Sequence, residues 1–343
     1  MSSMKFDALG QPVEKSDIDA FAMRQRIQNP YRLDQQSILG IVGTVFILVI
    51  AGLMVSKDNL MIGSVYLVTI TILLVILVPF ALRVARRQRK YLMESAVRAE
   101  RFANDNGWVY TYRTTDLHFP GTLFEQGDSH AYYNVIQAPE FYVGRCTFMT
   151  GTGRSRHENH YGFMIMQLDR HMPHMLLDGK SNNMRLFGSD ISNFQQSFPK
   201  DQVVSLEGDF DKYFTLYAPE TYGFDSRYIF TPDLMSLLIN ESEGIDIEVR
   251  DNQLFIYFGK YDVGNLAFWQ RIEKIKGTLG NKFVDRMERY RDNRTDDGLV
   301  AATGTRLEAK IPLFKRLLVY FILICVAYQV YGIVKAFFTV DWL

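Results

Sequence analysis

The chain has 343 residues, with 38 lysines and arginines against 38 aspartates and glutamates, so its formal net charge is zero. This balance argues against a strongly basic surface, and we expect no nucleic-acid partner. The two cysteines, Cys146 and Cys325, show no CxxC spacing, so the sequence indicates neither a disulfide framework nor a thiolate zinc site. The first 37 residues lack a short apolar core ahead of a small-residue cleavage site, and we expect no removable signal peptide.

The N-terminal arm, residues 1–37, contains Pro12 and Pro30, interspersed charges and no sustained apolar period. This composition is typical of mobile chain or of chain lying on a membrane surface. A short helix over Ala20–Ile27 is the most regular structure that the pattern supports.

Three apolar segments predict transmembrane helices: Ile38–Val55, Leu60–Leu82 and Leu317–Val334. Each comes close to the roughly 20 apolar residues that cross a hydrocarbon core of about 30 Å, and none contains a charged residue. Only residues 56–59 separate the first two segments, so residues 38–82 are predicted to form a helical hairpin. The alternative is a set of core helices in a soluble protein, which can be equally apolar.

Basic residues indicate how these helices are oriented. They cluster directly after the second segment, at Arg83, Arg86, Arg87, Arg89 and Lys90, and directly before the third, at Lys310, Lys315 and Arg316. Both clusters flank the same intervening region, residues 83–310, whereas the hairpin tip offers only Lys57. By the positive-inside rule, the N-terminus and residues 83–310 are cytoplasmic, and segment 311–343 places the C-terminus outside.

Residues 83–310 predict a cytoplasmic α+β domain with a mainly antiparallel sheet. Helical periodicity continues from Arg83 to Asn106, so the second span extends into a stalk helix. A start signal, Thr231-Pro232-Asp233, opens a helix over Leu234–Asn240. Another helix is expected over about Asn265–Tyr290, with glycines weakening its middle.

Short apolar or alternating runs between these helices predict strands. The runs are Trp108–Tyr112, Phe141–Met149, Tyr161–Leu168, Met175–Leu177, Asn183–Phe187, Phe210–Tyr217, Ile245–Arg250 and Gln253–Phe258. The last two flank Asp251-Asn252, which is a tight hairpin signal. Two small lobes that separate near Gly188–Pro199 are an alternative to one domain.

Three runs resemble recurrent segments of a bacterial protein family. They are LDRHMPHMLLD (168–178), SLEGDFDKYFTLY (205–217) and YIFTPDLM (228–235). The family is an uncharacterised domain-of-unknown-function family of membrane proteins found in actinobacterial and candidate-phylum genomes, and the resemblance covers about Arg98 to Arg294. It implies a bacterial cytoplasmic-membrane protein, but it brings no known activity, cofactor or catalytic residue.

The loop Thr150–Arg156, with sequence TGTGRSR, is the most suggestive candidate binding site. Gly151 and Gly153 can expose backbone N–H groups, and Arg154 and Arg156 offer guanidinium groups to a phosphate or carboxylate. The GxxxxGK[ST] spacing of a P-loop is missing, and no helix pattern follows. A flexible hairpin connection is the alternative. If the loop binds an anion, we expect a soluble anion or the anionic inner leaflet.

Two histidine pairs follow this loop, His157 with His160 and His171 with His174. They would ligate zinc if a strand brought the pairs together. The HxxH spacing suits one face of a helix, however, and the surrounding sequence is extended. Structural or surface histidines are therefore favoured over a metal site.

Three acidic residues, Glu207, Asp209 and Asp211, alternate along the chain and would share one face of an extended strand. Such a row binds a divalent cation or supplies an acid and a base. A solvated face is the favoured alternative. A GxSxG motif is absent, and Cys146 lies in an alternating run with no neighbour that would lower the pKa of its thiol.

These observations favour a membrane-anchored cytoplasmic domain that binds a partner protein, a second copy of the chain or a small ligand, without a cofactor. The lipid bilayer is the other expected partner. An enzymatic activity is less favoured than a binding function. The alternatives are an accessory subunit of a transport or envelope-assembly complex, and a membrane-tethered metal-dependent hydrolase that uses the histidines or the acidic row.

Overall fold

The computed structural model describes residues 4–308, except for 34–37, 39, 41, 44, 48, 51–59, 187–188, 193, 195–197, 242–243, 260, 288 and 296–298. The predicted third span, Leu317–Val334, lies outside the described residues, and the first span is described only in part. Contacts divide the chain into unit 1 (Met1–Arg113, Asn134–Ala138, Asp262–Arg271) and unit 2 (Thr114–Tyr133, Pro139–Tyr261, Ile272–Leu343). The units do not separate at Gly188–Pro199.

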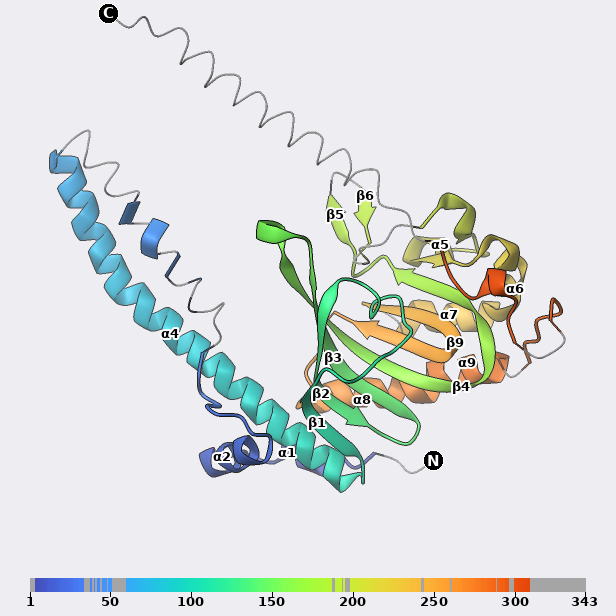
Figure 1. Cartoon of the computed structure of the whole chain (residues 1–343), viewed down its shortest axis with the longest axis horizontal. Helices are drawn as coiled ribbons and strands as arrows, with labels where there is room; N and C mark the ends of the chain where they lie inside the picture. Colours follow the sequence, from blue (N-terminus) through green and yellow to red (C-terminus); the bar gives the residue numbers. More distant parts are fainter. Residues whose placement is uncertain are drawn as a thin grey trace, which may run out of the picture. The chain divides into compact units, whose positions relative to one another are not determined.

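Unit 1 is built on one long helix, α4, which runs from Leu60 to Asp105 (Figure 1). Within the described residues, Val68–Asp105 is the one helical stretch that is long and apolar enough to cross a membrane, and 6% of its most apolar window is buried. Val65, Val75 and Phe80 are each more than 60% exposed. A core helix of a soluble protein would bury such side chains along at least one face.

The second half of α4 has the opposite character, because its apolar side chains are buried. Met93, Ala96 and Val97 are at most 1% exposed, and Phe102 is completely buried. The Phe102 ring lies 4.4 Å from the ring of Trp269 on α8 (Leu266–Ile275) and 5.4 Å from that of Trp108. The predicted helix from Arg83 to Asn106 is confirmed as this half of α4.

The expectation of a mobile N-terminal arm is wrong for residues 4–24. Two helices form there, α1 (Asp7–Gly10) and α2 (Lys15–Arg24). Ile18 and Phe21 are fully buried and form a core cluster with Met93, Ala96 and Val97 of α4. The apolar face of α2 is short, and a helix of this length gains its stability from tertiary packing. The composition of the segment alone therefore did not reveal that it folds.

Polar contacts reinforce this packing. Arg101 of α4 pairs with Asp17 at 2.7 Å, and Arg24 pairs with Glu100 at 2.5 Å. Glu14 and Asp17 form a capping box at the start of α2, which satisfies backbone N–H groups that the first helical turn leaves unpaired.

We expect Phe21→Ala to destabilise the full-length protein by about 3–5 kcal/mol, because it removes a fully buried aromatic ring. The matched control is Met23→Ala, two residues away on the same helix, where the side chain is 80% exposed. Thermal unfolding in detergent, with protease sensitivity of the arm, is the measurement. Equal effects of the two substitutions would contradict the packed arm.

The sheet has seven strands in the order β1-β2-β3-β4-β8-β7, with β9 paired to β4, and the predicted α+β fold with an antiparallel sheet is confirmed. The strands are β1 (Val109–Thr114), β2 (Asp128–Gln137), β3 (Phe141–Thr150), β4 (His157–Gly179), β7 (Val203–Val204), β8 (Phe214–Tyr217) and β9 (Ile245–Phe258). β4 organises the sheet, because β3 and β8 pair with successive parts of one edge and β9 follows the other. β2 was not predicted.

Two predicted breaks in the sheet are wrong. The runs Tyr161–Leu168 and Met175–Leu177 belong to the single strand β4, and no hairpin forms at Asp251-Asn252, which lies inside β9. Asp251 has a φ of 54°, and it pairs with Met172 between two register shifts of the β4–β9 ladder. The polar dipeptide therefore marks a bulge, a feature whose sequence signal resembles that of a turn.

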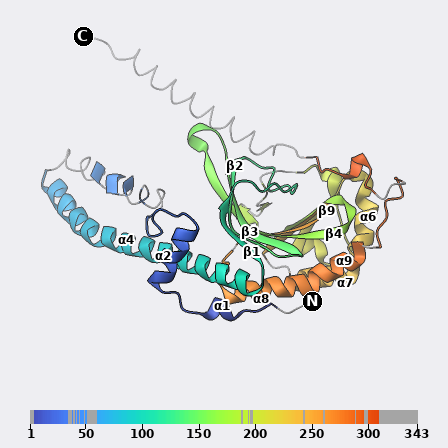
Figure 2. The ribbon, with the colours of Figure 1, turned by 60° about the horizontal axis from the view of Figure 1, so that its bottom comes forward.

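The remaining elements of unit 2 are short. They are η1 (Gly153–Ser155), β5 (Met184–Leu186), β6 (Ser189–Ile191), η2 (Lys200–Gln202), α5 (Phe210–Tyr213), η3 (Glu220–Tyr222), α6 (Gly223–Ile229), α7 (Pro232–Glu241), η4 (Lys276–Gly280), α9 (Asn281–Met287) and η5 (Ala302–Gly304). The helix predicted after Thr231 is confirmed as α7. The helix predicted near 265–290 is confirmed as α8 and α9, and the π-helical turn η4 occupies its glycine-containing middle. Figure 2 shows α7 and α9 on the same face of the sheet.

Candidate functional site

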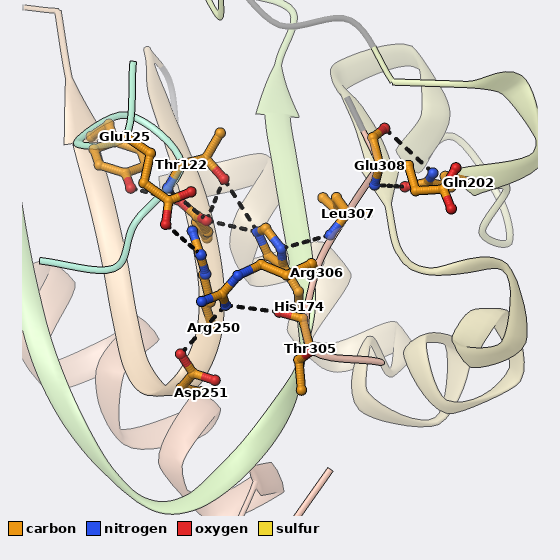
Figure 3. Close-up of polar contacts among 12 residues, drawn as sticks. Thr122, Glu125, His174, Gln202, Arg250, Asp251, Thr305, Arg306, Leu307 and Glu308 are labelled. Carbon is orange, nitrogen blue, oxygen red and sulfur yellow. Dashed lines mark hydrogen bonds and ion pairs between the residues drawn. The ribbon is translucent and has the colours of Figure 1, made fainter. Parts of the chain in front are cut away.

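A buried polar network lies where β4, β9 and the loop before β2 meet (Figure 3). Its centre is Glu248 on β9, which is completely buried. The Glu248 carboxylate accepts hydrogen bonds from the hydroxyls of Thr122 (2.6 Å) and Tyr257 (2.5 Å) and from the Thr122 backbone N–H (2.9 and 3.0 Å). His174 Nε2 lies 2.7 Å from Glu248 Oε1. One carboxylate thus connects three segments of unit 2.

The loop reaches this centre because Gly121 has no side chain. A methyl group built on Gly121 would lie 2.4 Å from the hydroxyl oxygen of Tyr257. The loop backbone can therefore approach Tyr257 closely and aim the N–H and hydroxyl of Thr122 at Glu248.

His174 is held in one neutral tautomer. The backbone N–H of Leu307 donates to His174 Nδ1 at 3.0 Å, so Nδ1 carries no proton. The proton is therefore on Nε2, which donates it to Glu248. This assignment follows from the two partners of the ring.

The network contains one ionised acid and one protonated phenol. Burial acts to raise the pKa of Glu248, but hydrogen bonds from His174, Thr122 and Tyr257 outweigh burial and hold the pKa below its usual value. Burial, followed by the negative charge of Glu248, holds the pKa of Tyr257 well above its usual value. At neutral pH, Tyr257 therefore donates and Glu248 accepts.

A chain segment, residues 305–308, is fixed against this network, and we call it the strap. The Leu307 side chain is 9% exposed, and its N–H is the group bound by His174. Gln202 pairs with the backbone of Glu308 in both directions, accepting from its N–H (3.0 Å) and donating to its carbonyl oxygen (3.4 Å). Arg306 lies 3.6 Å from Asp251. The contacts are mainly to backbone atoms.

Arg250 lies two residues from Glu248 on β9, and its side chain is 1% exposed. Its Nη2 donates to Glu125 Oε1 at 2.6 Å, while Nε and Nη1 have no hydrogen-bond partner among the described residues. Residues two apart share one face of a strand, so the buried guanidinium supplies a positive charge beside the buried carboxylate.

The geometry suits the binding of a backbone segment more than acid–base catalysis. Both ring nitrogens of His174 are engaged inside the protein, and Glu248 is enclosed by its donors. A general base must come within hydrogen-bond reach of its substrate proton. In the described part of the chain, the groups of this network reach the strap.

The predicted binding loop Thr150–Arg156 is the tip of the β3–β4 hairpin; Thr150 is buried, whereas Thr152, Ser155 and Arg156 are exposed. Gly151 and Gly153 have φ of 86° and 56°, which is the left-handed region that favours glycine. Arg156 forms an ion pair with Asp128 and lies 3.1 Å from the Ser129 hydroxyl. The side chain of Arg154 lies outside what the structure describes. Anion binding by this loop stays a prediction.

The four histidines of β4 are not brought together as two ligand pairs. His157 contacts the Thr150 hydroxyl (3.0 Å), and His160 lies 3.9 Å from Glu158. His171 is exposed, whereas His174 is buried in the network. Residues three apart point to opposite faces of a strand, so the HxxH spacing separates the members of each pair. Among the described residues, no three His, Cys, Asp or Glu side chains are arranged to hold a metal ion.

The prediction of a strand over Phe210–Tyr217 is wrong for its first half, because Phe210–Tyr213 forms the helix α5. Asp209 precedes this helix and pairs with Lys212 (2.7 Å), whereas Asp211 accepts from the Ser205 hydroxyl (2.5 Å). Gly208, with a φ of 69°, turns the chain between Glu207 and Asp209. The three carboxylates therefore do not form one face of a strand.

Two of these acids nonetheless line a surface pocket of about 360 Å³ between α5 and α7. Glu207 and Asp209 share its lining with the apolar side chains of Phe210, Pro232, Met235 and Ile239. The pocket combines an apolar floor with carboxylates. It is a concavity of unit 2 that suits a ligand with an apolar part and a positive charge.

The network of Glu248, Thr122, Tyr257 and the strap was missed by reasoning from sequence. His174 and Glu248 are 74 residues apart, and Leu307 lies 133 residues from His174. The one available signal was polarity in apolar strands. Glu248 and Arg250 interrupt the run Ile245–Phe258, and a charged residue inside a buried strand requires a partner.

No protein-family model and no curated protein sequence matches the chain. Among solved structures, the crystal structure of the mycobacterial trehalose monomycolate transport factor A, TtfA, is similar at 13% sequence identity with a TM-score of 0.34. The alignment covers 56% of this chain and 92% of that chain. A TM-score of this size does not establish a shared fold.

We expect His174→Ala to release the strap, because the substitution removes the acceptor of the Leu307 N–H and one donor to a buried carboxylate. The expected loss of stability is about 2–4 kcal/mol, because a buried carboxylate loses one donor and the Leu307 N–H loses its acceptor. Hydrogen exchange of the peptide that contains Leu307 should accelerate. His171→Ala is the matched control, since His171 is exposed on the same strand, and it should change stability by less than about 0.5 kcal/mol. If hydrogen exchange at Leu307 is unchanged in His174→Ala, then His174 does not hold the strap in place.

Proposed function

We propose that this protein is an integral membrane protein that presents its α+β domain at the inner leaflet of a bacterial cytoplasmic membrane, as a binding domain for a protein partner. The observation that supports this proposal best is α4, a single helix whose first half exposes apolar side chains and whose second half is buried in unit 1. Lipid is the solvent that suits the first half. The second half of α4 instead suits the interior of a folded domain that is surrounded by water.

The full proposal has three spans, with the N-terminus and the domain in the cytoplasm and the C-terminus outside. Its support is the basic clusters after Leu82 and before Leu317, together with the resemblance to a family of bacterial membrane proteins. The strap adds a physical argument. The strap, residues 305–308, is hydrogen-bonded to His174 and Gln202 directly before the second basic cluster. A third span would therefore anchor the domain close to these contacts.

A protein partner, or a second copy of the chain, is favoured by exposed aromatic side chains on unit 2. Phe224 and Tyr228 lie one turn apart on α6 and are 79% and 57% exposed. Aromatic residues are enriched at protein interfaces, where they bury a large area at a low entropic cost. An accessory subunit of a transport or envelope-assembly complex is the specific form of this function that partner identification would decide.

Single-cysteine labelling tests the topology. In a Cys325→Ser background, where the remaining Cys146 is buried, we expect a membrane-impermeant maleimide to label Lys57→Cys and Leu343→Cys in intact cells. Arg87→Cys should be labelled only after permeabilisation. Labelling of Arg87→Cys in intact cells would overturn the cytoplasmic placement of the domain, and protection of Leu343→Cys would overturn the third span.

Affinity purification in mild detergent tests the binding function. The wild-type protein should retain a defined partner or elute as a homo-oligomer. The double substitution Phe224→Ser and Tyr228→Ser should reduce recovery at least tenfold, since interface aromatics often contribute 2 kcal/mol or more. Val109→Ser is the control for loss of an exposed apolar side chain, because Val109 is 60% exposed in unit 1. A monomer without any partner would count against the proposal.

A further inference from the structure

Two buried carboxylates of unit 2 face each other across the sheet. Asp178 lies near the end of β4 and Asp246 near the start of β9, and they are 2% and 1% exposed. The ladder pairs Leu177 with Ile247, so its next step places Asp178 opposite Asp246 on one face. Like charges in directly opposed positions destabilise a sheet. A buried pair of this kind requires a compensating group.

The turn that follows β4 contacts both carboxylates. Asp246 accepts hydrogen bonds from the Gly179 N–H and the Asn182 side-chain amide, both at 2.9 Å. The amide of Asn183 donates to Asp178 Oδ2 at 3.5 Å. Two oxygen atoms are left over, because Asp178 Oδ1 and Asn182 Oδ1 are buried and have no hydrogen-bond partner among the described residues. Both atoms are acceptors, so each lacks a hydrogen-bond donor among the described residues.

Three oxygen atoms converge beside Gly179. A methyl group built on Gly179 would lie 2.6 Å from the carbonyl oxygen of Ile245 and 3.5 Å from both Asn182 Oδ1 and Asp246 Oδ1. Carboxylate, amide and backbone carbonyl oxygens are the ligand types that Ca²⁺ takes in proteins. The donor set is therefore one for a hard cation, without nitrogen or sulfur.

Nearby side chains offset this charge only in part: Ser192 and Asn183 hydrogen-bond to Asp178, and the positive charge of Lys180 acts on it without an ion pair. Asp178 has no ion pair with a described residue, and the ammonium of Lys180 donates to the backbone carbonyl oxygen of Asp211. Burial, followed by the charge of Asp246, raises the pKa of Asp178 to about 7.

We propose that Asp178, Asn182, Asp246 and the Ile245 carbonyl oxygen form a binding site for a divalent cation of the Ca²⁺ type, with water completing its coordination. The two carboxylates balance the charge of the ion, and its coordination uses the two oxygens that otherwise lack partners. The ion would fasten the turn after β4 to the start of β9. This proposal is independent of the membrane function and of the strap.

Thermal unfolding of the chelator-treated full-length protein in detergent at pH 8 is the test. Added Ca²⁺ should raise the Tm saturably, by roughly 5–10 °C at one hundred times Kd, whereas sodium chloride of equal ionic strength should not. The same titration with Mg²⁺ and with Mn²⁺ measures the selectivity of the site. Asp178→Asn should abolish the Ca²⁺ effect without loss of fold, because it removes the repulsion. Asp209→Asn, with a 68% exposed side chain, is the control and should respond as the wild type does.

A direct probe accompanies this measurement. Tb³⁺ replaces Ca²⁺ at oxygen sites, and Tyr161 and Tyr217 lie near enough for the charges of Asp246 and Asp178 to affect their pKa values, so tyrosine excitation should give saturable Tb³⁺ luminescence. Asp178→Asn should lose that signal. The proposal is overturned if wild type shows neither effect at pH 8. It is equally overturned if Asp178→Asn keeps the full Ca²⁺ response.

Discussion

The folded state of unit 2 depends on how one buried negative charge is satisfied. Removing a carboxylate from water costs several kcal/mol, and this cost is offset only when hydrogen bonds replace the lost hydration. Glu248 receives such bonds from a loop threonine, a strand tyrosine and a strand histidine. The donors lie on the loop before β2, on β9 itself and on β4. The carboxylate therefore fixes the relative positions of these segments more specifically than apolar packing would.

The histidine extends this constraint to the strap. Nε2 of His174 donates to Glu248, and Nδ1 accepts from the backbone N–H of Leu307. The ring orientation that allows the first hydrogen bond therefore also allows the second. Gln202 holds the adjacent peptide group in both directions. Because these contacts are to backbone atoms, the strap is selected by its position in the fold, and its side chains contribute less.

Local patterns predicted much of the fold. The continuous helix through Arg83, the start of α7 at Pro232 and the glycine-weakened helix near 265–290 all follow from spacing and end signals within one element. The errors occurred where tertiary packing decides the structure. The apolar face of α2 is too short to give a clear helical pattern in the sequence, and the bulge at Asp251 has the composition of a turn.

The candidate site could not be assembled from the sequence for a related reason. The loop at 150–156 and the acidic row attracted attention because their residues are adjacent in the chain. The groups that do converge come from positions 122, 174, 248, 257 and 307, and an isolated polar residue in an apolar run carries no record of its partner. Only the burial of Glu248 and Arg250 made the need for partners visible.

The unbroken course of α4 has a mechanical consequence. At 1.5 Å per residue its 46 residues extend about 69 Å, more than twice the hydrocarbon thickness of about 30 Å. Pro79, in the half of α4 whose apolar side chains are exposed, removes one backbone hydrogen bond and is a position where such a helix can kink. From Pro79 to the aromatic cluster around Phe102 no further proline interrupts α4, so this part of the helix transmits tilt and axial rotation along its length. If the apolar half of α4 spans a bilayer, a change of bilayer thickness that alters the tilt of this half would also alter the tilt of the buried half.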